Sequence, residues 1–293
     1  MGPEPLMSQD NPQIAKRLKS VHLKNLKLSG LDLTEAWWEK CRIEDSVFEN
    51  IKFNQSEIAA SDFVNCEFIQ CDFSYSFLGQ NKGKDSGSFR NVKFIRSNFK
   101  DVNFCFPLFE DCLFDHCKLK MVDFDGSRFV STKFRGIIDQ CWFRGYADHA
   151  HTSFLWLFSR VRVSDFSNPM QVDFSEATLI ANTFSHKIDL SKCILPSDGT
   201  VLLVEYLQNT YRSVREEIER EWKGEDKRIG LGYVDEIFFN KDRQDQPNDI
   251  VDINFLGETV VGRKFFELVK RINKSVKDDK SSSPDQLHQH VSL

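Results

Sequence analysis

Large apolar residues recur at every fifth position over much of this chain. The first uninterrupted series is Leu23, Leu28, Leu33, Trp38, Ile43, Phe48, Phe53, Ile58, Phe63, Phe68, Phe73 and Leu78. A second series contains Phe89, Phe94, Phe99, Phe104, Phe109, Phe114, Leu119, Phe124, Phe129 and Phe134. Side chains return to one face every 3.6 residues in an α-helix and every 2 in a strand, so a period of five indicates a solenoid.

A second position of the repeat, two residues before each centre, holds small residues. It contains seven of the eight cysteines, namely Cys41, Cys66, Cys71, Cys112, Cys117, Cys141 and Cys193, and elsewhere mostly Ser or Val. Cys105 lies outside this position. We therefore interpret the cysteines as small buried core residues rather than as disulfides or metal ligands, which fits a reducing compartment. The sequence also shows no apolar signal segment near Met1, and we expect a cytoplasmic protein.

The repeating unit is a small residue, any residue, Phe or Leu, and two further residues, as in Val122-Asp-Phe124-Asp-Gly126. This pattern resembles the pentapeptide-repeat family, whose usual motif is Ala-(Asp/Asn)-Leu-x-x. The resemblance implies a right-handed quadrilateral β-helix in which four five-residue sides make one coil. Residues twenty apart would then stack, as Ile43 over Leu23 and Phe73 over Phe53, with the centre and the small residue pointing inward.

The sequence predicts an all-β solenoid followed by a mainly α-helical C-terminal segment. Residues 1–20 are expected to form an N-terminal extension or cap, 21–196 the β-helix, 197–277 a helical module and 278–293 a disordered tail. Two interruptions of the repeat predict loops near residues 79–88 and 144–152.

The C-terminal segment contains two stripes with helical spacing. The first consists of Leu203, Leu207, Tyr211, Val214, Ile218 and Trp222, and the second of Val261, Phe265, Leu268, Ile272 and Val276. Between them, 250–255 reads as a short strand and 230–233 as a turn. Because an open solenoid end must be covered, we expect these helices to cap it in the same chain or to form a homodimer. Related pentapeptide-repeat proteins often dimerise in this way, so the first stripe is the candidate dimer or docking surface.

No catalytic motif, cofactor site or metal site is indicated by the sequence. Gly230-Leu-Gly232 is too short for a dinucleotide-binding loop, and Asp148, His149 and His151 lack a third ligand. Cys112 and Cys117 are expected to point inward and His116 outward, so they cannot converge. We therefore predict a protein that is not an enzyme and needs no cofactor.

The formal net charge is −5, and the charges are unevenly distributed. Acidic residues predominate from 32 to 72, and basic residues from 82 to 100. The candidate partner-binding residues are Glu44, Asp62, Asp72, Lys82, Lys84 and Arg90.

Two functions fit this pattern. The leading hypothesis is a rigid protein-binding scaffold that acts through its outer faces, loops and C-terminal helices. The alternative is mimicry of DNA to bind a type II topoisomerase such as gyrase, as the resemblance to quinolone-resistance members of the family implies; it requires a dense row of negative charge. Direct nucleic-acid binding is not favoured, since the aromatic residues are mostly inside, and no membrane span is expected.

Overall fold

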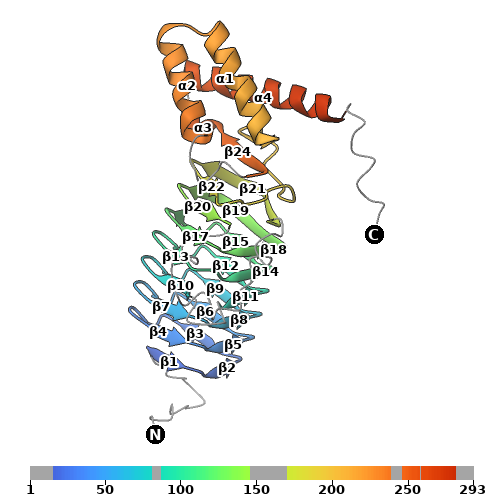
Figure 1. Ribbon diagram of the computed structural model, residues 1–293. Coiled ribbons are helices and arrows are strands. Elements are labelled where there is room, and N and C mark those ends of the chain that lie inside the picture. The colour runs from blue at the N-terminus through green and yellow to red at the C-terminus, as the bar shows by residue number, and fades with distance from the viewer. Residues whose placement is uncertain (1–15, 81–86, 146–169, 239–245, 258, 282–293) are drawn as a thin grey trace, which may run out of the picture. The chain divides into compact units, whose positions relative to one another are not determined.

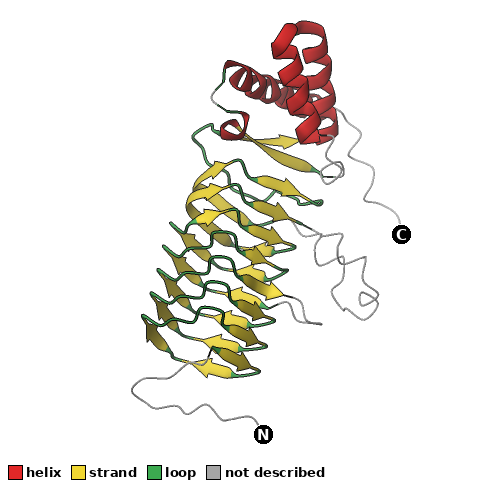
Figure 2. Ribbon diagram, turned by 90° about the vertical axis from the view of Figure 1, so that its left-hand side faces the viewer, coloured by secondary structure: helices red, strands yellow, loops and turns green. Residues whose placement is uncertain are grey.

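The computed structural model describes residues 16–80, 87–145, 170–238, 246–257 and 259–281. The chain divides into two compact units, residues 1–197 and 198–293, which are described separately. Unit 1 is a stack of short parallel strands, and the helices lie in unit 2 (Figures 1 and 2). Among the described helices, none has the length and apolarity needed to cross a membrane.

The strands of unit 1 form three parallel sheets, which are three sides of the coil. The first side consists of β1 (Arg17–Lys19), β4 (Trp37–Glu39), β7 (Glu57–Ala59), β10 (Phe77–Gln80), β13 (Asn103–Phe104), β17 (Asp123–Asp125), β20 (Trp142–Arg144) and β22 (Thr183–Ser185). The second consists of β2 (His22–Lys24), β5 (Arg42–Glu44), β8 (Asp62–Val64), β11 (Ser88–Arg90), β14 (Leu108–Glu110) and β18 (Arg128–Val130). The third consists of β3 (Lys27–Ser29), β6 (Val47–Glu49), β9 (Glu67–Ile69), β12 (Lys93–Ile95), β15 (Leu113–Asp115), β19 (Thr132–Asp139) and β21 (Val172–Ile180).

A fourth side is held by single parallel bridges rather than by a continuous sheet. Its bridges join Asp32, Lys52, Asp72, Asn98 and Lys118 in that order. The short strand β16 (Leu119–Lys120) continues this side and pairs with the second half of β19. Four sides per coil, with the repeat centres inside, are the quadrilateral arrangement that the resemblance to the pentapeptide-repeat family implies.

The stacking register confirms the twenty-residue coil and also shows where it changes. Leu23, Ile43 and Phe63 stand opposite one another in adjacent strands, twenty residues apart. The next partner of Phe63 is Phe89, so this coil is longer by six residues. The extra residues fall within the predicted loop 79–88, of which β10 and β11 occupy the two ends. Residues 81–86 lie outside the described part of the chain.

A second change of register shortens one coil by a residue. Leu119 is opposite Ile138, nineteen residues later, because β19 turns the corner at Gly136, where φ is 90°. Ile138 is fully buried and acts as a repeat centre that the five-residue pattern missed. Of the predicted loop 144–152, only residues 144 and 145 are described, and 146–169 lie outside the description. The core continues beyond it, since Phe174 stacks on Phe134 at 5.5 Å.

Three positions of the five-residue repeat explain why the sequence folds locally in this way. The centres stack as columns of rings, for example Phe114 between Phe94 and Phe134 with centroid distances of 4.8 and 4.6 Å. In the small slot, Ser56 Oγ accepts a hydrogen bond from Ala36 N at 2.9 Å and donates one to Leu33 O at 3.2 Å.

The corner position, two residues after the centre, adopts positive φ in coil after coil. Asn25, Asp45, Asn65 and Asn91 are examples, with φ between 50° and 56°. Asn and Asp tolerate this left-handed conformation better than other residues with a Cβ atom, so the polar corner residues permit the sharp turn between sides.

The described residues of unit 2 form a two-stranded antiparallel sheet and four helices. Its elements are β23 (Val201–Glu205), α1 (Leu207–Glu221), α2 (Gly224–Phe238), β24 (Asn248–Asp252), α3 (Ile253–Leu256) and α4 (Val260–Ser281). The side chain of Asn273 on α4 binds the edge of β23, donating to Leu203 O and accepting from Glu205 N, both at 3.0 Å.

Several C-terminal expectations need correction. Leu203 lies in β23 rather than in the first helix, and residues 230–233 lie inside α2 rather than in a turn. Gly230 fits within the helix because it packs against Trp222, where a Cβ atom would approach the indole ring to 2.8 Å. Residues 278–281 of the predicted disordered tail are helical, and the rest of that tail lies outside the described residues.

Candidate interaction surface

The outer walls of unit 1 carry its candidate site, because the interior is filled by side chains. Phe48, Phe68, Phe94, Phe114 and Phe134 form one continuous internal column, with neighbouring centroids 4.6 to 5.3 Å apart. All five side chains are at most 1% exposed. The residues that flank each centre point outward and form rows, one residue per coil, at the strand spacing of about 4.8 Å.

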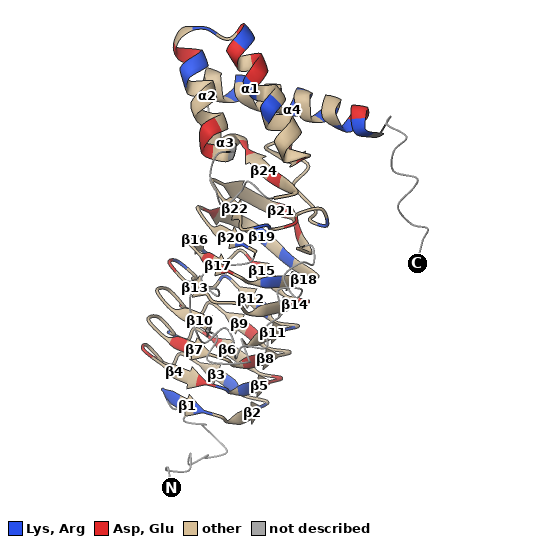
Figure 3. Ribbon diagram, in the orientation of Figure 1, with Lys and Arg blue, Asp and Glu red and all other residues tan. Residues whose placement is uncertain are grey.

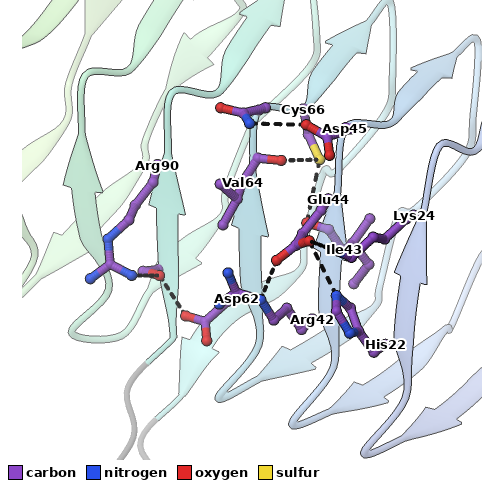
Figure 4. Close-up of polar contacts among 12 residues, drawn as sticks. His22, Lys24, Arg42, Ile43, Glu44, Asp45, Asp62, Val64, Cys66 and Arg90 are labelled. Atoms are coloured by element: carbon purple, nitrogen blue, oxygen red, sulfur yellow. Dashed lines mark hydrogen bonds and ion pairs between the residues drawn. The ribbon is translucent and has the colours of Figure 1, made fainter.

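Glu44 on β5 is surrounded by basic side chains (Figure 4). Its carboxylate forms ion pairs with Lys24 and Arg42, and its Oε2 lies 3.3 Å from His22 Nε2. The hydrogen bond from Lys24, with further contributions from Arg42 and His22, lowers the pKa of Glu44 to about 2. The side chain is only 11% exposed. Glu44 is therefore neutralised by its neighbours rather than presented as free negative charge.

This network predicts a pH-dependent contribution to stability. The folded pKa of Glu44, about 2, lies below its ordinary value of 4.5, so the stabilisation is fully present above pH 4.5 and is lost as the pH falls toward 2. We expect Glu44→Gln to lower the melting temperature near pH 7, with the difference from wild type disappearing between pH 4.5 and 2. The matched control is Glu49→Gln, which removes an exposed carboxylate that has no ion pair among the described residues. A Glu44→Gln difference that does not change with pH would contradict the assignment.

Asp62 and Arg90 share the second side with Glu44 but make other contacts (Figure 4). Asp62 Oδ1 accepts a hydrogen bond from Ser88 Oγ at 2.5 Å, and Arg90 Nη1 donates to the same hydroxyl oxygen at 3.2 Å. Arg90 Nε also pairs with Glu110 on the next coil at 2.9 Å. These two candidates are thus linked through Ser88.

Asp72 lies on the fourth side, whereas Glu44 and Asp62 lie on the second side in two different rows. Its Oδ1 accepts hydrogen bonds from Ser74 N at 3.0 Å and from Asn98 Nδ2 at 2.9 Å. The first of these bonds forms an Asx turn, and Asp32 makes the same turn with Thr34. The carboxylate of Asp72 therefore has a local structural role. Lys82 and Lys84 lie outside the described residues, and their role stays a prediction.

Ion pairs between coils offset part of the acidic charge read from the sequence. Lys93 of the basic stretch pairs with Glu67 of the acidic stretch at 2.8 Å. Lys19 pairs with Glu39 at 3.3 Å within the first coils. Figure 3 shows basic and acidic segments interspersed along the solenoid. The candidate acidic residues consequently do not form a continuous unpaired row.

Two exposed aromatic residues interrupt the polar wall at the corner between the fourth and first sides. Tyr75 is 50% exposed and Phe77 is 49% exposed, while Ser76 between them is buried. Lys100 Nζ donates to Tyr75 Oη at 3.0 Å and lies 5.3 Å from the ring centroid. Sequence reasoning missed this pair. Aromatic residues at outward positions of the repeat, in Tyr75-Ser76-Phe77, were the available signal.

The residues of the first C-terminal stripe are not a surface. Tyr211, Val214 and Ile218 are 0% exposed, Leu207 is 2% exposed and Trp222 is 6% exposed. They pack with Val269 and the other core residues of α4, α2 and β24 into the hydrophobic core of unit 2. Leu203 of β23 is half-buried. The expected dimer or docking surface is therefore the interior of the module, because the apolar face of α1 is covered by α4 and α2.

All eight cysteines are free thiols, and all except Cys105 occupy the predicted small slots. Cys71 Sγ donates to Phe48 O at 3.3 Å, and Cys112 Sγ donates to Phe89 O at 3.2 Å. Burial raises the pKa of both thiols from 9.0 to about 12. His116 instead faces solvent and pairs with Asp115 at 2.8 Å, so it does not meet Cys112 or Cys117. Asp148, His149 and His151 lie outside the described residues.

These thiols are expected to resist alkylation in the folded protein. A pKa higher by three units lowers the thiolate fraction about 1,000-fold, and the stacked coils also block access. We expect iodoacetamide at pH 8 to modify Cys71 and Cys112 at least about 1,000-fold more slowly in native protein than in guanidinium-unfolded protein. Peptide mass spectrometry measures this ratio. Equal rates in the two states would show that the small slots are open to solvent.

Comparison with solved structures finds distant similarities. The chain is 17% identical to a trypsin-treated variant of QnrB1, a plasmid-mediated fluoroquinolone resistance protein, with a TM-score of 0.37 over 59% of this chain and 73% of the other. It is 12% identical to HetL of Nostoc sp. strain PCC 7120, a pentapeptide-repeat protein involved in heterocyst differentiation regulation. That alignment has a TM-score of 0.31 over 61% of this chain and 86% of HetL.

The chain resembles the pentapeptide-repeat proteins. No protein-family model and no curated protein matches its sequence. A third solved pentapeptide-repeat protein, Rfr23 from Cyanothece 51142, is 8% identical, with a TM-score of 0.28 over 43% of this chain and 88% of that protein. These similarities are distant, and no partner or residue role is transferred from them. The solenoid of this chain differs from the usual pentapeptide-repeat motif in filling its small slot mainly with Ser and Cys, and most of its centres with Phe.

Proposed function

We propose that this protein is a non-enzymatic scaffold that binds a protein partner through the outer walls of its β-helix. The observation that carries the proposal is the exposed pair Tyr75 and Phe77, which stands on a wall whose outward positions are otherwise mainly polar. Exposed aromatic side chains are typical of the centres of protein interfaces, because they bury a large area at a small cost in side-chain entropy.

Two further features support a binding role. The stacked phenylalanine columns fix the positions of the outward side chains, so a partner would meet rows that need little ordering upon binding. The filled interior leaves the outer surface as the place where recognition can occur. We place this function in the cytoplasm, where free buried thiols are usual.

An affinity capture experiment tests the scaffold function. Wild-type protein and the double variant Tyr75→Ser, Phe77→Ser are immobilised, and captured proteins are quantified by mass spectrometry. The matched control is Phe255→Ser, which removes a 41% exposed aromatic residue from unit 2. We expect a specific partner to be retained by wild type and control and lost from the double variant, while all three melt at the same temperature. The same captured proteins in the same amounts with all three would overturn the proposal.

Mimicry of DNA is the less favoured function. It requires closely spaced unpaired carboxylates, as phosphates in duplex DNA occur about every 1.7 Å of axis. Glu44 is instead paired with three basic residues, and Asp72 lies on another side of the coil. A gyrase supercoiling assay separates the two functions, because inhibition or protection by this protein, abolished by charge reversal of Asp62 and Asp72, would favour mimicry.

A further inference from the structure

The fourth side of the solenoid carries a distinct cluster of basic and apolar side chains next to the exposed aromatic pair. We call this cluster the lysine patch. It consists of Tyr75, Arg96, Lys100, Lys118, Lys120, Met121 and Ile137.

Backbone hydrogen bonds show that these residues lie on consecutive coils. Tyr75 N donates to Lys100 O, and Asp101 N donates to Lys120 O, both at 3.0 Å. The parallel bridge between Asn98 and Lys118 places Lys118 one coil from Lys100. Ile137 follows on the next coil, because its neighbour Ile138 stands opposite Leu119. The patch therefore spans four stacked coils, with rows separated by about 4.8 Å.

The lysine patch is positively charged on a protein whose formal net charge is −5. Its four cations are accompanied by two carboxylates, with Lys120 Nζ 2.9 Å from Asp139 and Lys100 Nζ 3.5 Å from Asp101. Arg96 and Lys118 are exposed and have no carboxylate partner within the described residues. The patch is therefore the part of the fourth side where cationic charge is left uncompensated.

Apolar side chains are interleaved with these cations. Ile137 is 57% exposed, and Met121 is 39% exposed. Met121 occupies the same corner row as Tyr75, two coils further along, and Asp101 stands between them in that row. Tyr75, Asp101 and Met121 each donate a backbone N–H to the next coil, to the carbonyl oxygens of Lys100, Lys120 and Asp139 respectively. Basic groups alternating with exposed apolar groups at strand spacing are complementary to a segment in which acidic and apolar residues are likewise mixed.

We propose that the lysine patch binds an acidic peptide segment of a partner protein, with its carboxylates on Lys118 and Arg96 and its apolar side chains against Tyr75, Met121 and Ile137. This proposal rests on the scaffold function and specifies its partner. The partner is a peptide rather than a nucleic acid because Asp101 and Asp139 would repel a continuous phosphate backbone. The aliphatic groups of Met121 and Ile137 also match peptide side chains better than stacked bases.

Fluorescence anisotropy with the full chain tests the proposal. The probe is a labelled synthetic peptide in which Asp and Glu alternate with Phe and Leu. A second probe is the same peptide with Lys in place of each acidic residue. A third probe is single-stranded oligothymidylate. We expect the acidic peptide to bind, and the variant Arg96→Glu, Lys118→Glu to weaken it at least about tenfold. Tyr75→Ser should also weaken it. Lys27→Glu, which reverses an exposed cation at the equivalent outward position of β3, should leave it unchanged.

Other results would overturn the proposal. These are no binding of the acidic peptide, equal binding to the charge-reversed variant, or oligothymidylate binding that is as tight and equally sensitive to Arg96 and Lys118. Self-association lost in the same variant during sedimentation would assign the patch to a second copy of the chain instead. If a captured protein depends on Tyr75 and Phe77 but not on Arg96 or Lys118, the scaffold function stands and only this inference fails.

Discussion

Replacing Phe114 with Ala is expected to destabilise the solenoid by about 3–5 kcal/mol, as large-to-small changes of buried aromatic residues do. Phe114 is 0% exposed, stacks on Phe94 and Phe134 in its own column, and meets Phe109 edge-on at a centroid distance of 5.5 Å. The parallel strands on either side hold the column in place, so the cavity cannot close fully. Chemical denaturation followed by far-ultraviolet circular dichroism measures the loss.

The matched control for this prediction is Phe77→Ala. Phe77 lies on the outward side of β10 and is 49% exposed, so its truncation should change the unfolding free energy by no more than about 0.5 kcal/mol. Phe114→Ala removes a phenyl ring from the inner side of the β-helix wall, and Phe77→Ala removes one from its outer side. Similar losses from both would mean that the phenylalanine columns are not the interior of the molecule.

Replacing Val214 with Asp is expected to unfold unit 2 rather than to separate a dimer. Val214 is 0% exposed within the core formed by α1, α2 and α4, and an unpaired carboxylate there costs more than about 4 kcal/mol. All the described α-helices belong to unit 2, so the dichroism at 222 nm reports on this unit. We expect that helical signal to fall at low denaturant concentration while the β-helix remains folded.

Arg212→Asp provides the control on the same helix, because Arg212 is exposed. It should leave the helical signal unchanged. A different outcome would be informative: a Val214→Asp protein that keeps its full helical signal but changes from dimer to monomer in light scattering would restore α1 as an oligomerisation surface.

Much of the β-helix could be predicted from its sequence because each repeat position has one environment. Phe53 and Cys71 both lie inside, as their positions in the repeat predict. Asp32 and Asn98 could likewise be placed before a centre, although the sequence did not reveal that such residues form Asx turns on the fourth side. The strict period indicated a solenoid, and the resemblance to the pentapeptide-repeat family supplied its four-sided coil.

The two changes of register could not be predicted because they depend on how coils of different length close. A gap of eleven residues between Leu78 and Phe89 does not reveal that six residues are extra, and Ile138 falls outside the five-residue beat. The charge environment of Glu44 could not be predicted from the sequence either, because it depends on contacts between coils. Its partners His22 and Lys24 lie about one coil earlier in the sequence, and only the stacking brings them together.

The C-terminal unit shows a different limit of sequence reasoning. An apolar stripe such as that of α1 has the same pattern whether it packs in the core of its own module or against a second chain. The partner helix α4 and the strand β24, which decide the matter, lie more than twenty residues beyond the end of α1. The exposed pair Tyr75 and Phe77 is hard to recognise in the sequence for a different reason: aromatic residues are so frequent at the repeat centres that two more at outward positions do not stand out.

Engineered disulfides test the stacked square coil most directly. Glu67 and Lys93 stand opposite each other in adjacent strands β9 and β12, although an uninterrupted twenty-residue coil would place Gly87 opposite Glu67. Under mild oxidation, the pair Glu67→Cys, Lys93→Cys should form a disulfide that peptide mapping detects, because adjacent strands lie within disulfide reach. The pair Glu67→Cys, Leu113→Cys, two coils apart, should not. Absence of the first bond, or equal formation of the second, would contradict the fold on which the binding surface depends.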